Sequence, residues 1–449
     1  MEAQEEKARR ALLRRLFEAG LEAVAPDKAL LRHVCMDNQT LLAGERQYPC
    51  GPGRRVLIVG GGKGVAPMAR ALEALLGRRL AAGTVVTRYG HGIPLERITL
   101  LEAAHPVPDE AGRRAAESML ELVRTATADD LVIALFTGGA SALTPAPVAG
   151  VSLEDLQEVT RLLLRSGATI HELNALRKHL SRFSGGQLAR AAAPAEVLGL
   201  LVSDVSGDDL DVIASGPTAP DASTFEDCLG IVDRYGLRAS FPGAALHHLL
   251  AGAAGQVPET PKQADPLFQK VCNRIVASNR QALEAVAAKA RELGLAPCFS
   301  SQALAGEART RAVTLLHEAQ RLSQTLRSDD RPICLLAGGE TTVTVRGGGQ
   351  GGRNQEMALA AYLELDRQPD LSRLCALFAG TDGIDGTTDA AGGFAFAGSA
   401  AAMRHNGVDP LALLDDNNSH AALAAAGDLL ITGPTRTNVM DLAIVLVYP

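Results

Sequence analysis

Short apolar runs alternate with stretches of helical periodicity along most of the chain, and this alternation restricts the fold more than any other feature. A short apolar run bounded by glycine, proline or polar residues is typical of a strand buried on both faces of a sheet. Such strands, separated by helices, predict parallel pairing with crossover helices. The expected strands lie at residues 56–59, 84–87, 98–102, 131–136, 197–203, 275–277, 333–337, 341–345 and 374–378, followed by an antiparallel pair at 429–432 and 442–447. The predicted fold class is therefore α/β.

The chain has 449 residues, which is more than one hydrophobic core usually supports, so we expect two domains. The alternation fails over residues 241–265, where glycine, proline and small residues predominate, and this segment is the expected linker or hinge. The predicted domains are thus an N-terminal parallel-sheet domain at 1–240 and a smaller C-terminal α/β domain with a mixed sheet at 266–449.

Composition excludes several classes of partner. The formal net charge of −7 argues against a nucleic-acid-binding protein, because a phosphate backbone requires a basic face. No apolar run reaches the roughly 18 residues of a membrane span, and the charged N-terminal helix is not a signal peptide. The seven cysteines are scattered and never form C-x-x-C, which indicates reduced thiols and a cytoplasmic protein.

The first glycine-rich loop is GGGKG at residues 60–64, where a strand ends and a helix at 65–76 begins. A helix N-terminus offers unpaired N–H groups and a positive dipole to an anion, and Lys63 adds a full charge. Gly61 and Gly62 are accordingly candidate phosphate contacts. The loop is not a Walker A motif, because Leu57 stands where that motif has glycine. The alternative is a tight strand-to-helix turn with a solvated lysine.

The second loop, residues 347–352, contains five glycines and is closed by Arg353. Without Cβ atoms, its N–H groups can approach a phosphate closely, beside a guanidinium. Its match to G-x-G-x-x-G carries little weight in so glycine-rich a stretch. Alternatively, Asn354 caps the following helix and Arg353 is solvated. The expected contacts of a phosphorylated cofactor in this region are Gly347, Gly349, Gly351, Gly352 and Glu340.

Acidic loops follow two of the expected strands. The first contains Asp204 and Asp208, and the second contains Asp382, Asp385 and Asp389. Carboxylates at strand ends suit Mg²⁺, which takes one or two of them together with water and substrate phosphates. Aspartates beside glycines are also common Asx-turn residues, which is the alternative reading. Weaker polar signals follow the strand at 131–136 and lie in the basic stretch at 174–178; they include Ser141, Asn174 and Arg177.

Taken together, these motifs resemble the class II glycerate 2-kinases, whose C-terminal part is known as the MOFRL domain. The matching blocks are GGGKGVAPMARAL (60–72), HPVPDEAG (105–112), FTGGASAL (136–143), LNALRKHLSRFSGGQLA (173–189), LLVSDVSGDDLDVIASGPT (200–218), GGETTVTVRGGGQGGRNQEMALA (338–360), AGTDGIDGTTDAAGG (379–393) and GDLLITGPTRTNVMDL (427–442). Thr387 stands where the family usually has proline, and Gln350 where it often has arginine or lysine. The second departure removes a positive charge from the expected phosphate loop.

The resemblance implies a Rossmann-like, doubly wound N-terminal domain and a C-terminal MOFRL domain, with an active site in the cleft between them. It implies phosphorylation of the 2-hydroxyl of D-glycerate by ATP and Mg²⁺, in a monomer or homodimer. Lys63 and Arg353 match positions proposed as catalytic in the family, and Asp204 is the third catalytic candidate. Ser141, Asn174 and Arg177 are the candidates for substrate binding, and Asp208, Asp382 and Asp385 those for metal binding. Which aspartate acts as base and which binds Mg²⁺ is open.

Two other functions compete with this interpretation. Members of the family have also been called hydroxypyruvate reductases, and a doubly wound fold allows NAD(P)H to bind, but the chain lacks a clean dinucleotide fingerprint. A non-catalytic sensor of sugar acids would not need Lys63 and Arg353 together with intact acidic loops. We therefore expect a glycerate 2-kinase that binds a small hydroxy acid and a nucleotide.

Overall fold

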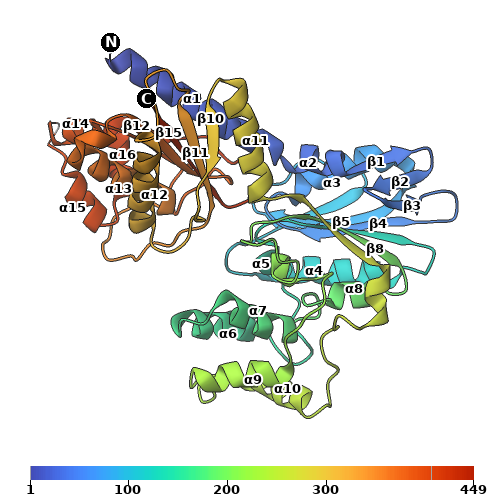
Figure 1. The fold of residues 1–449 in the computed structure, drawn as a ribbon. Coiled ribbons are helices and arrows are strands. Elements are labelled where there is room, and N and C mark those ends of the chain that lie inside the picture. The colour runs from blue at the N-terminus through green and yellow to red at the C-terminus, as the bar shows by residue number, and fades with distance from the viewer. Residues whose placement is uncertain (1, 406) are drawn as a thin grey trace. The chain divides into compact units, whose positions relative to one another are not determined.

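The computed structural model describes residues 2–405 and 407–449, which divide into two compact units (Figure 1). The N-terminal unit comprises Pro26–Val276, and the C-terminal unit comprises Ala277–Pro449 together with the residues up to Ala25. These boundaries differ from the predicted ones at the N-terminal segment and at the junction between the domains. Helix α1 (Glu2–Ala23) packs against α11 (Asn279–Glu292) of the C-terminal unit, and the predicted linker at 241–265 lies inside the N-terminal unit.

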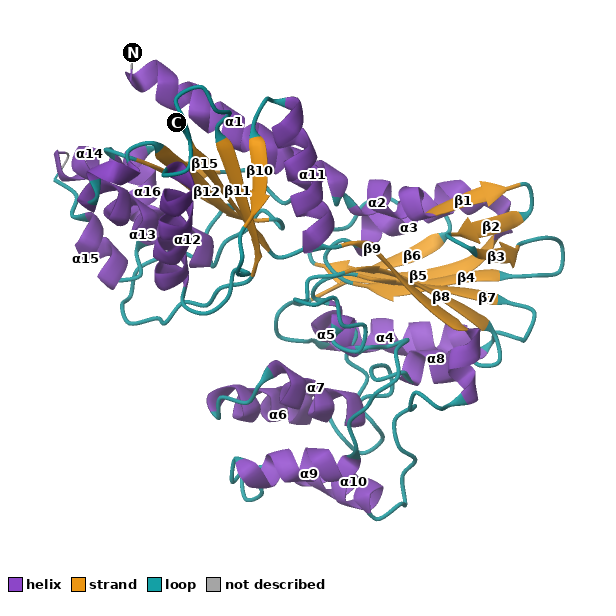
Figure 2. Ribbon diagram, in the orientation of Figure 1, coloured by secondary structure: helices purple, strands orange, loops and turns teal. Residues whose placement is uncertain are grey.

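A six-stranded sheet forms the centre of the N-terminal unit, in the order β6-β5-β4-β7-β8-β9. The pairs β6–β5, β5–β4, β4–β7 and β7–β8 are all parallel, as predicted. Figure 2 shows α3 on one face of this sheet and α4 and α8 on the other. Its elements are β4 (Val56–Gly61), α3 (Val65–Leu76), η1 (Gly77–Arg79), β5 (Leu80–Arg88), β6 (Ile98–Ala103), α4 (Glu110–Arg124), β7 (Leu131–Phe136), α5 (Ala140–Leu143), α8 (Gln187–Ala192), β8 (Glu196–Val202), η2 (Ile213–Ser215), η3 (Pro266–Lys270) and β9 (Val271–Ala277).

The strand order determines where a ligand can bind. The chain runs outward from β4 through β5 to β6, and then returns to β7 on the other side of β4. In open α/β sheets, ligands bind beyond the carboxyl ends of the strands at such a reversal. The loops that follow β4 and β7 therefore flank the expected binding position.

Two smaller parts complete the N-terminal unit. One is an antiparallel sheet of β1 (Val34–Asp37), β2 (Thr40–Ala43) and β3 (Arg46–Pro49), preceded by α2 (Pro26–His33). The other is a helical layer with its own apolar core, formed by α6 (Leu153–Arg165), α7 (Ile170–His179), α9 (Phe225–Arg234) and α10 (Gly243–Ala253).

Helix α10 corrects the prediction of a linker at 241–265. Its buried residues Ala245, Leu249 and Gly252 recur at helical spacing and pack in the layer with α9. A Cβ on Gly252 would lie 2.3 Å from the ring of Phe225, so this glycine serves close packing. Small residues in this segment indicate flexibility in the sequence, but in the structure they form a contact face.

The C-terminal unit contains a mixed sheet in the order β10-β11-β15-β12-β13-β14, which confirms the predicted mixture. Only β10 and β11 pair in parallel. The last strand, β15, lies antiparallel between β11 and β12 and does not pair with β14. The elements are β10 (Ala296–Phe299), α12 (Ala308–Ser323), β11 (Ile333–Gly339), α13 (Arg353–Arg367), η4 (Pro369–Leu371), β12 (Leu374–Gly380), β13 (Gly392–Phe396), α14 (Ser399–His405), α15 (Pro410–Asp415), α16 (Ser419–Ala426), β14 (Leu429–Leu430) and β15 (Asp441–Val447).

The strand predicted at 341–345 is absent. This segment forms only an isolated bridge between Thr342 and Glu307, and Val345 is 75% exposed. Its β-branched residues match a strand in type, but the backbone of Thr342 bonds to Gly306 and Ala308, just before and at the start of α12, rather than to a strand. Among the described residues, no helix is long and apolar enough to cross a membrane.

Candidate active site

The loop after β4 packs tightly against the loop after β7. A Cβ on Gly60, near the end of β4, would lie 2.2 Å from the carbonyl oxygen of Leu135 in the paired strand β7. In the loops themselves, a Cβ on Gly62 would lie 2.1 Å from Oγ1 of Thr137. Gly62 also has a φ of 131°, in the region that favours glycine. Gly60 is therefore required by the contact between the two strands, and Gly62 by the contact between the two loops.

The backbone donors of this loop are already used. The N–H of Lys63 donates to the carbonyl of Gly138 over 2.9 Å, and the N–H of Gly64 donates to Oγ1 of Thr137 over 2.9 Å. The N–H of Gly62 donates to the carbonyl of Val86. This corrects the expected phosphate cradle at 60–64: the loop offers the side chain of Lys63 rather than unpaired N–H groups.

Lys63 lies near a histidine that the motif analysis did not single out. A Cβ on Gly139 would lie 3.5 Å from Cγ of Lys63 and 2.9 Å from Cδ2 of His105, so the two side chains flank this glycine. His105 falls within one of the matching sequence blocks, which was the only signal for it.

The three candidate substrate residues lie on two neighbouring helices of the same unit. Ser141 is on α5, directly after β7, and Asn174 and Arg177 lie one turn apart on one face of α7. Oγ of Ser141 is 2.8 Å from Oγ of Ser215, which in turn donates to Oδ1 of Asn174 over 3.3 Å. Ser215 therefore links two of the predicted residues.

Arg177 is a half-buried cation without a carboxylate partner among the described residues. Burial lowers the pKa of its guanidinium, and no neighbouring charge compensates. The next residue on the helix contrasts with it, because Lys178 pairs with both Asp211 and Asp221. An uncompensated guanidinium is suited to an anionic ligand.

The acidic loop after β8 places Asp204 and Asp208 in the N-terminal unit, where both are partly exposed. Asp208 has a φ of 59° and lines a hollow of about 850 Å³ together with Asp211, Asp221 and Lys262. Within the described ranges, no group of three or more histidine, cysteine, aspartate or glutamate residues is arranged to hold a metal ion. The donor types suit Mg²⁺, which needs only one or two protein carboxylates when phosphates complete its shell.

The glycine loop at 347–352 binds to its own unit. The N–H groups of Gly347, Gly348 and Gln350 donate to the side chains of Asn417, Asp416 and Asn418 respectively. The N–H of Gly349 donates to the carbonyl of Asp416 over 3.0 Å. This corrects the expectation for Gly347 and Gly349, whose N–H groups are not available to a phosphate.

The same loop yields a matched pair of substitutions. A Cβ on Gly349 would lie 2.3 Å from Cβ of Asn418, whereas a Cβ on Gly348 would meet nothing within 4 Å. We expect Gly349→Ala to lower the free energy of unfolding of the C-terminal unit by about 1–3 kcal/mol, the usual cost of overpacking. Gly348→Ala should change it by less than about 0.5 kcal/mol. Urea denaturation followed by circular dichroism would measure both, and equal effects would contradict this packing role.

Arg353 begins α13 and is held by two carboxylates. Its Nε and Nη2 donate to the two oxygens of Asp441 over 2.6 and 3.0 Å, and its Nη1 pairs with Glu340. Burial opposes the charge on Arg353, but the fully buried Asp441 outweighs this effect and raises the pKa of the guanidinium. Burial also raises the pKa of Glu340. The predicted alternative of a solvated Arg353 is therefore wrong.

Asp385 caps α13. It is 2% exposed, and its oxygens accept the N–H groups of Asn354 over 3.1 Å and Gln355 over 2.8 Å. Burial raises its pKa to about 6. Asp385, predicted as a metal ligand, is therefore already bonded to the first turn of α13. The residue that caps this helix is Asp385 and not Asn354. Asp382 is partly exposed and accepts the N–H of Ile384, which is the Asx-type contact of the alternative reading.

The predicted site residues are thus divided between the units. Lys63, Ser141, Asn174, Arg177, Asp204 and Asp208 lie in the N-terminal unit, and Glu340, the glycines at 347–352, Arg353, Asp382 and Asp385 lie in the C-terminal unit. The structure joins Ser141 to Asn174 through Ser215, and Arg353 to Glu340 directly. Sequence reasoning missed Asp441, although it stands at the start of an apolar run and within the matching block at 427–442.

Comparison with known proteins agrees with this architecture. A model described as a domain of unknown function (DUF4147) matches residues 12–250, and the MOFRL family model matches residues 333–441. The glycerate 2-kinase of Pyrococcus horikoshii is 39% identical, with 96% of each chain covered. A protein of Agrobacterium vitis, provisionally named a hydroxypyruvate reductase, is 41% identical over 98% of this chain and 94% of its own.

A solved structure extends the agreement to three dimensions. The crystal structure of glycerate kinase from Thermotoga maritima matches with a TM-score of 0.84 at 38% identity. The match covers 98% of this chain and 100% of that one. Both the sequence and the fold are therefore shared over nearly the whole length, and this chain belongs to the MOFRL family of glycerate 2-kinases.

Proposed function

We propose that this protein transfers the γ-phosphoryl group of ATP to the 2-hydroxyl of D-glycerate, giving 2-phosphoglycerate and ADP. The observation that supports it most is Arg177, a half-buried guanidinium with no carboxylate partner among the described residues. It lies one turn from Asn174, which is linked through Ser215 to the hydroxyl of Ser141. A cation beside amide and hydroxyl groups suits a small hydroxy acid, whose carboxylate Arg177 would bind in a bidentate manner.

Lys63 and Arg353 are the proposed stabilisers of the phosphoryl group. Phosphoryl transfer depends chiefly on positioning and on balancing negative charge in the transition state. Arg353 is fixed by Asp441 and Glu340, so its remaining N–H groups have a defined direction. The N–H groups of Gly351, Gly352 and Arg353 have no acceptor among the described residues, and they lie at the N-terminus of α13. These donors are the proposed phosphate contacts.

The remaining acidic residues have two proposed roles. Asp204 would accept the proton of the 2-hydroxyl as it attacks, because a carboxylate within hydrogen-bond reach of a hydroxyl can act as a general base. Asp208 and Asp382 are the proposed Mg²⁺ ligands, and the metal would neutralise charge on the ATP phosphates when bound. A cytoplasmic location and a monomeric or homodimeric state remain predictions.

A reductase is the competing function, supported by the name of the Agrobacterium relative. The G-x-G-x-x-G match at 347–352 does not favour it, because most N–H groups of that loop are bonded to residues 416–418. A pyrophosphate needs such groups unpaired.

Two assays on one preparation separate these functions. With D-glycerate, ATP and Mg²⁺ we expect ADP release that requires all three components. With hydroxypyruvate and NADH or NADPH we expect no loss of absorbance at the nicotinamide band. Reduction of hydroxypyruvate without ADP release in the first assay would overturn the proposed function.

A further inference from the structure

Ser215 occupies a central position between two proposed substrate residues. It lies in η2, its side chain is buried, and its hydroxyl contacts both Ser141 over 2.8 Å and Asn174 over 3.3 Å. Neither contact is with a neighbour in sequence, since Ser215 is 74 residues from Ser141 and 41 residues from Asn174. Ser215 therefore joins the helices α5 and α7 that present these side chains.

The backbone at Ser215 is strained. Ala214, Ser215 and Gly216 have consecutive φ values of 54°, 60° and 62°, which only glycine adopts readily. The carbonyls of Ser215 and Gly216 accept the N–H groups of Gly185 and Gly186 over 2.9 and 2.7 Å, and these bonds hold the segment in place. Strained residues that the surrounding structure holds in place cluster at functional sites.

The contacts of Ser215 determine which groups donate and which accept. Oδ1 of Asn174 can only accept, so the hydroxyl of Ser215 donates to it. Ser215 has one proton, and its contact with Ser141 must therefore be donated by Ser141. The oxygen of Ser141 therefore keeps lone pairs that can accept a further hydrogen bond. The Nδ2 group of Asn174 keeps its donors, and no described residue provides an acceptor for them.

We propose that Ser215 is a positioning residue that makes Ser141 a hydrogen-bond acceptor and Asn174 a donor toward the substrate. This inference rests on the proposed function. Ser141 would accept a hydrogen bond from the 3-hydroxyl of glycerate, and Asn174 would donate to an oxygen of the same molecule whose carboxylate binds Arg177. A site built to accept from a hydroxyl discriminates strongly against an analogue that lacks it, because a polar group is then left unpaired.

The test compares the binding of D-glycerate with that of D-lactate, which keeps the carboxylate and the 2-hydroxyl but lacks the 3-hydroxyl. We expect the wild-type protein to prefer D-glycerate by about 10²-fold or more in dissociation constant, measured by calorimetry. In Ser215→Ala the freed O–H of Ser141 can reorient, and the preference should fall about 10-fold, mainly through weaker glycerate binding. The KM for glycerate should rise by a similar factor, with kcat changed far less.

Ala214→Gly is the matched control, because it relieves the neighbouring backbone strain but leaves the hydroxyl of Ser215 in place. It should keep the wild-type preference. Ser141→Ala removes the acceptor itself and should lose at least as much of the preference as Ser215→Ala does. The double variant should lose no more than Ser141→Ala, since both act through one contact. Ser215→Gly also removes the hydroxyl and suits the positive φ of 60° at this position, so it keeps the test decisive if Ser215→Ala does not fold.

The outcomes separate this inference from the proposed function. A wild-type protein that binds no D-glycerate and releases no ADP with it would overturn the proposed function. A wild-type preference that survives the loss of the Ser215 hydroxyl, whatever Ser141→Ala shows, would overturn the role of Ser215 alone. An equal loss of preference in Ala214→Gly would also overturn it, because backbone geometry rather than the hydroxyl would then be responsible.

Discussion

Replacing Arg353 with lysine should lower kcat by about 10²-fold or more at saturating ATP and glycerate, with a much smaller change in the KM for glycerate. Lysine keeps the charge but lacks the planar fork, and the two residues are not interchangeable where a bidentate contact is made. Here Nε and Nη2 lie 2.6 and 3.0 Å from the two oxygens of Asp441. A lysine ammonium cannot hold both oxygens and also stay directed at a phosphoryl group. Lys63→Ala should show a similar loss.

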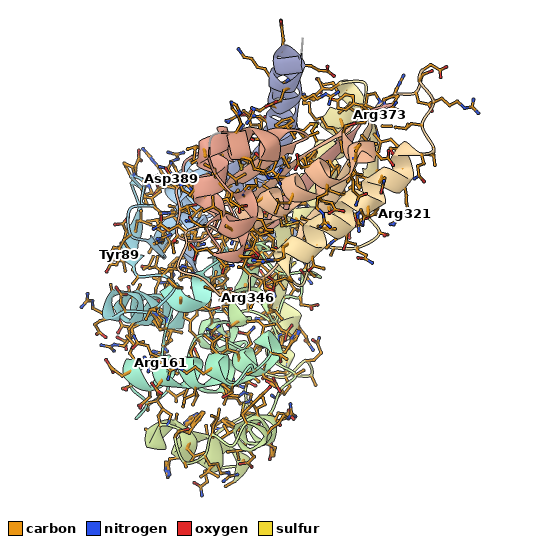
Figure 3. All side chains as sticks on the ribbon, turned by 90° about the vertical axis from the view of Figure 1, so that its left-hand side faces the viewer. Tyr89, Arg161, Arg321, Arg346, Arg373 and Asp389 are labelled. Carbon is orange, nitrogen blue, oxygen red and sulfur yellow. The ribbon has the colours of Figure 1, made fainter. Side chains whose placement is uncertain are left out.

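The control for this substitution is Arg346→Lys. Arg346, labelled in Figure 3, is an exposed arginine seven residues earlier in the same glycine-rich segment. It should tolerate lysine with near-wild-type kcat. Because Asp441 is fully buried, Arg353→Lys should also reduce stability, so rates must be compared well below both melting temperatures. Near-wild-type kcat in Arg353→Lys would leave Arg353 with a purely structural role.

Arg177→Met should raise the KM for glycerate by about 10²-fold or more, because a charge-assisted bidentate contact with the carboxylate is lost. Most substitutions of a buried arginine lower stability, but this one should leave the stability of the substrate-free protein unchanged or raise it. Burial lowers the pKa of Arg177 without a compensating carboxylate, so the folded protein gains nothing from this charge until substrate binds. The melting temperature of the substrate-free variant should therefore equal or exceed that of the wild type, as in other exchanges of stability for function.

Arg190→Met provides the matched control. Burial also lowers the pKa of Arg190, but this side chain donates to the carbonyl of Glu259 over 2.9 Å and to Gln187 over 3.2 Å. Its replacement should lower the melting temperature and leave the KM for glycerate unchanged. A falling melting temperature together with an unchanged KM in Arg177→Met would contradict the assignment of Arg177 to the substrate.

The parts of the fold that the sequence predicts best are those with strong local periodicity. The helix expected at 65–76 and the strand at 131–136 agree with α3 and β7, because glycine bounds the helix at both ends, and two aspartates precede the strand while a glycine turn follows it. Two of the failures have one cause, which is tertiary context. At 241–265, small residues that resemble a hinge are packed against Phe225, and at 341–345 a β-branched run finds no strand to pair with.

The sequence predicts which residues belong to the candidate site better than it predicts which groups they contact. Lys63 and Arg353 were recognised from motifs, but their partners were not, since Asp441 lies 88 residues from Arg353. The glycine loops were interpreted as phosphate cradles because glycine permits close approach. The structure shows that the close approach is largely to the protein itself, at Thr137 for one loop and at residues 416–418 for the other. A glycine-rich pattern indicates that some group lies close to the backbone, but it does not indicate whether that group belongs to a ligand or to the protein.

The position of the phosphoryl group in the product tests the proposed function most directly. The protein would be incubated with D-glycerate, ATP and Mg²⁺, and the product examined by ³¹P and ¹H nuclear magnetic resonance. We expect one phosphorylated acid, whose phosphorus couples to the single proton on C2, formed in equal amount to ADP. A product whose phosphorus couples to the two protons on C3, or no phosphorylated product at all, would contradict the account.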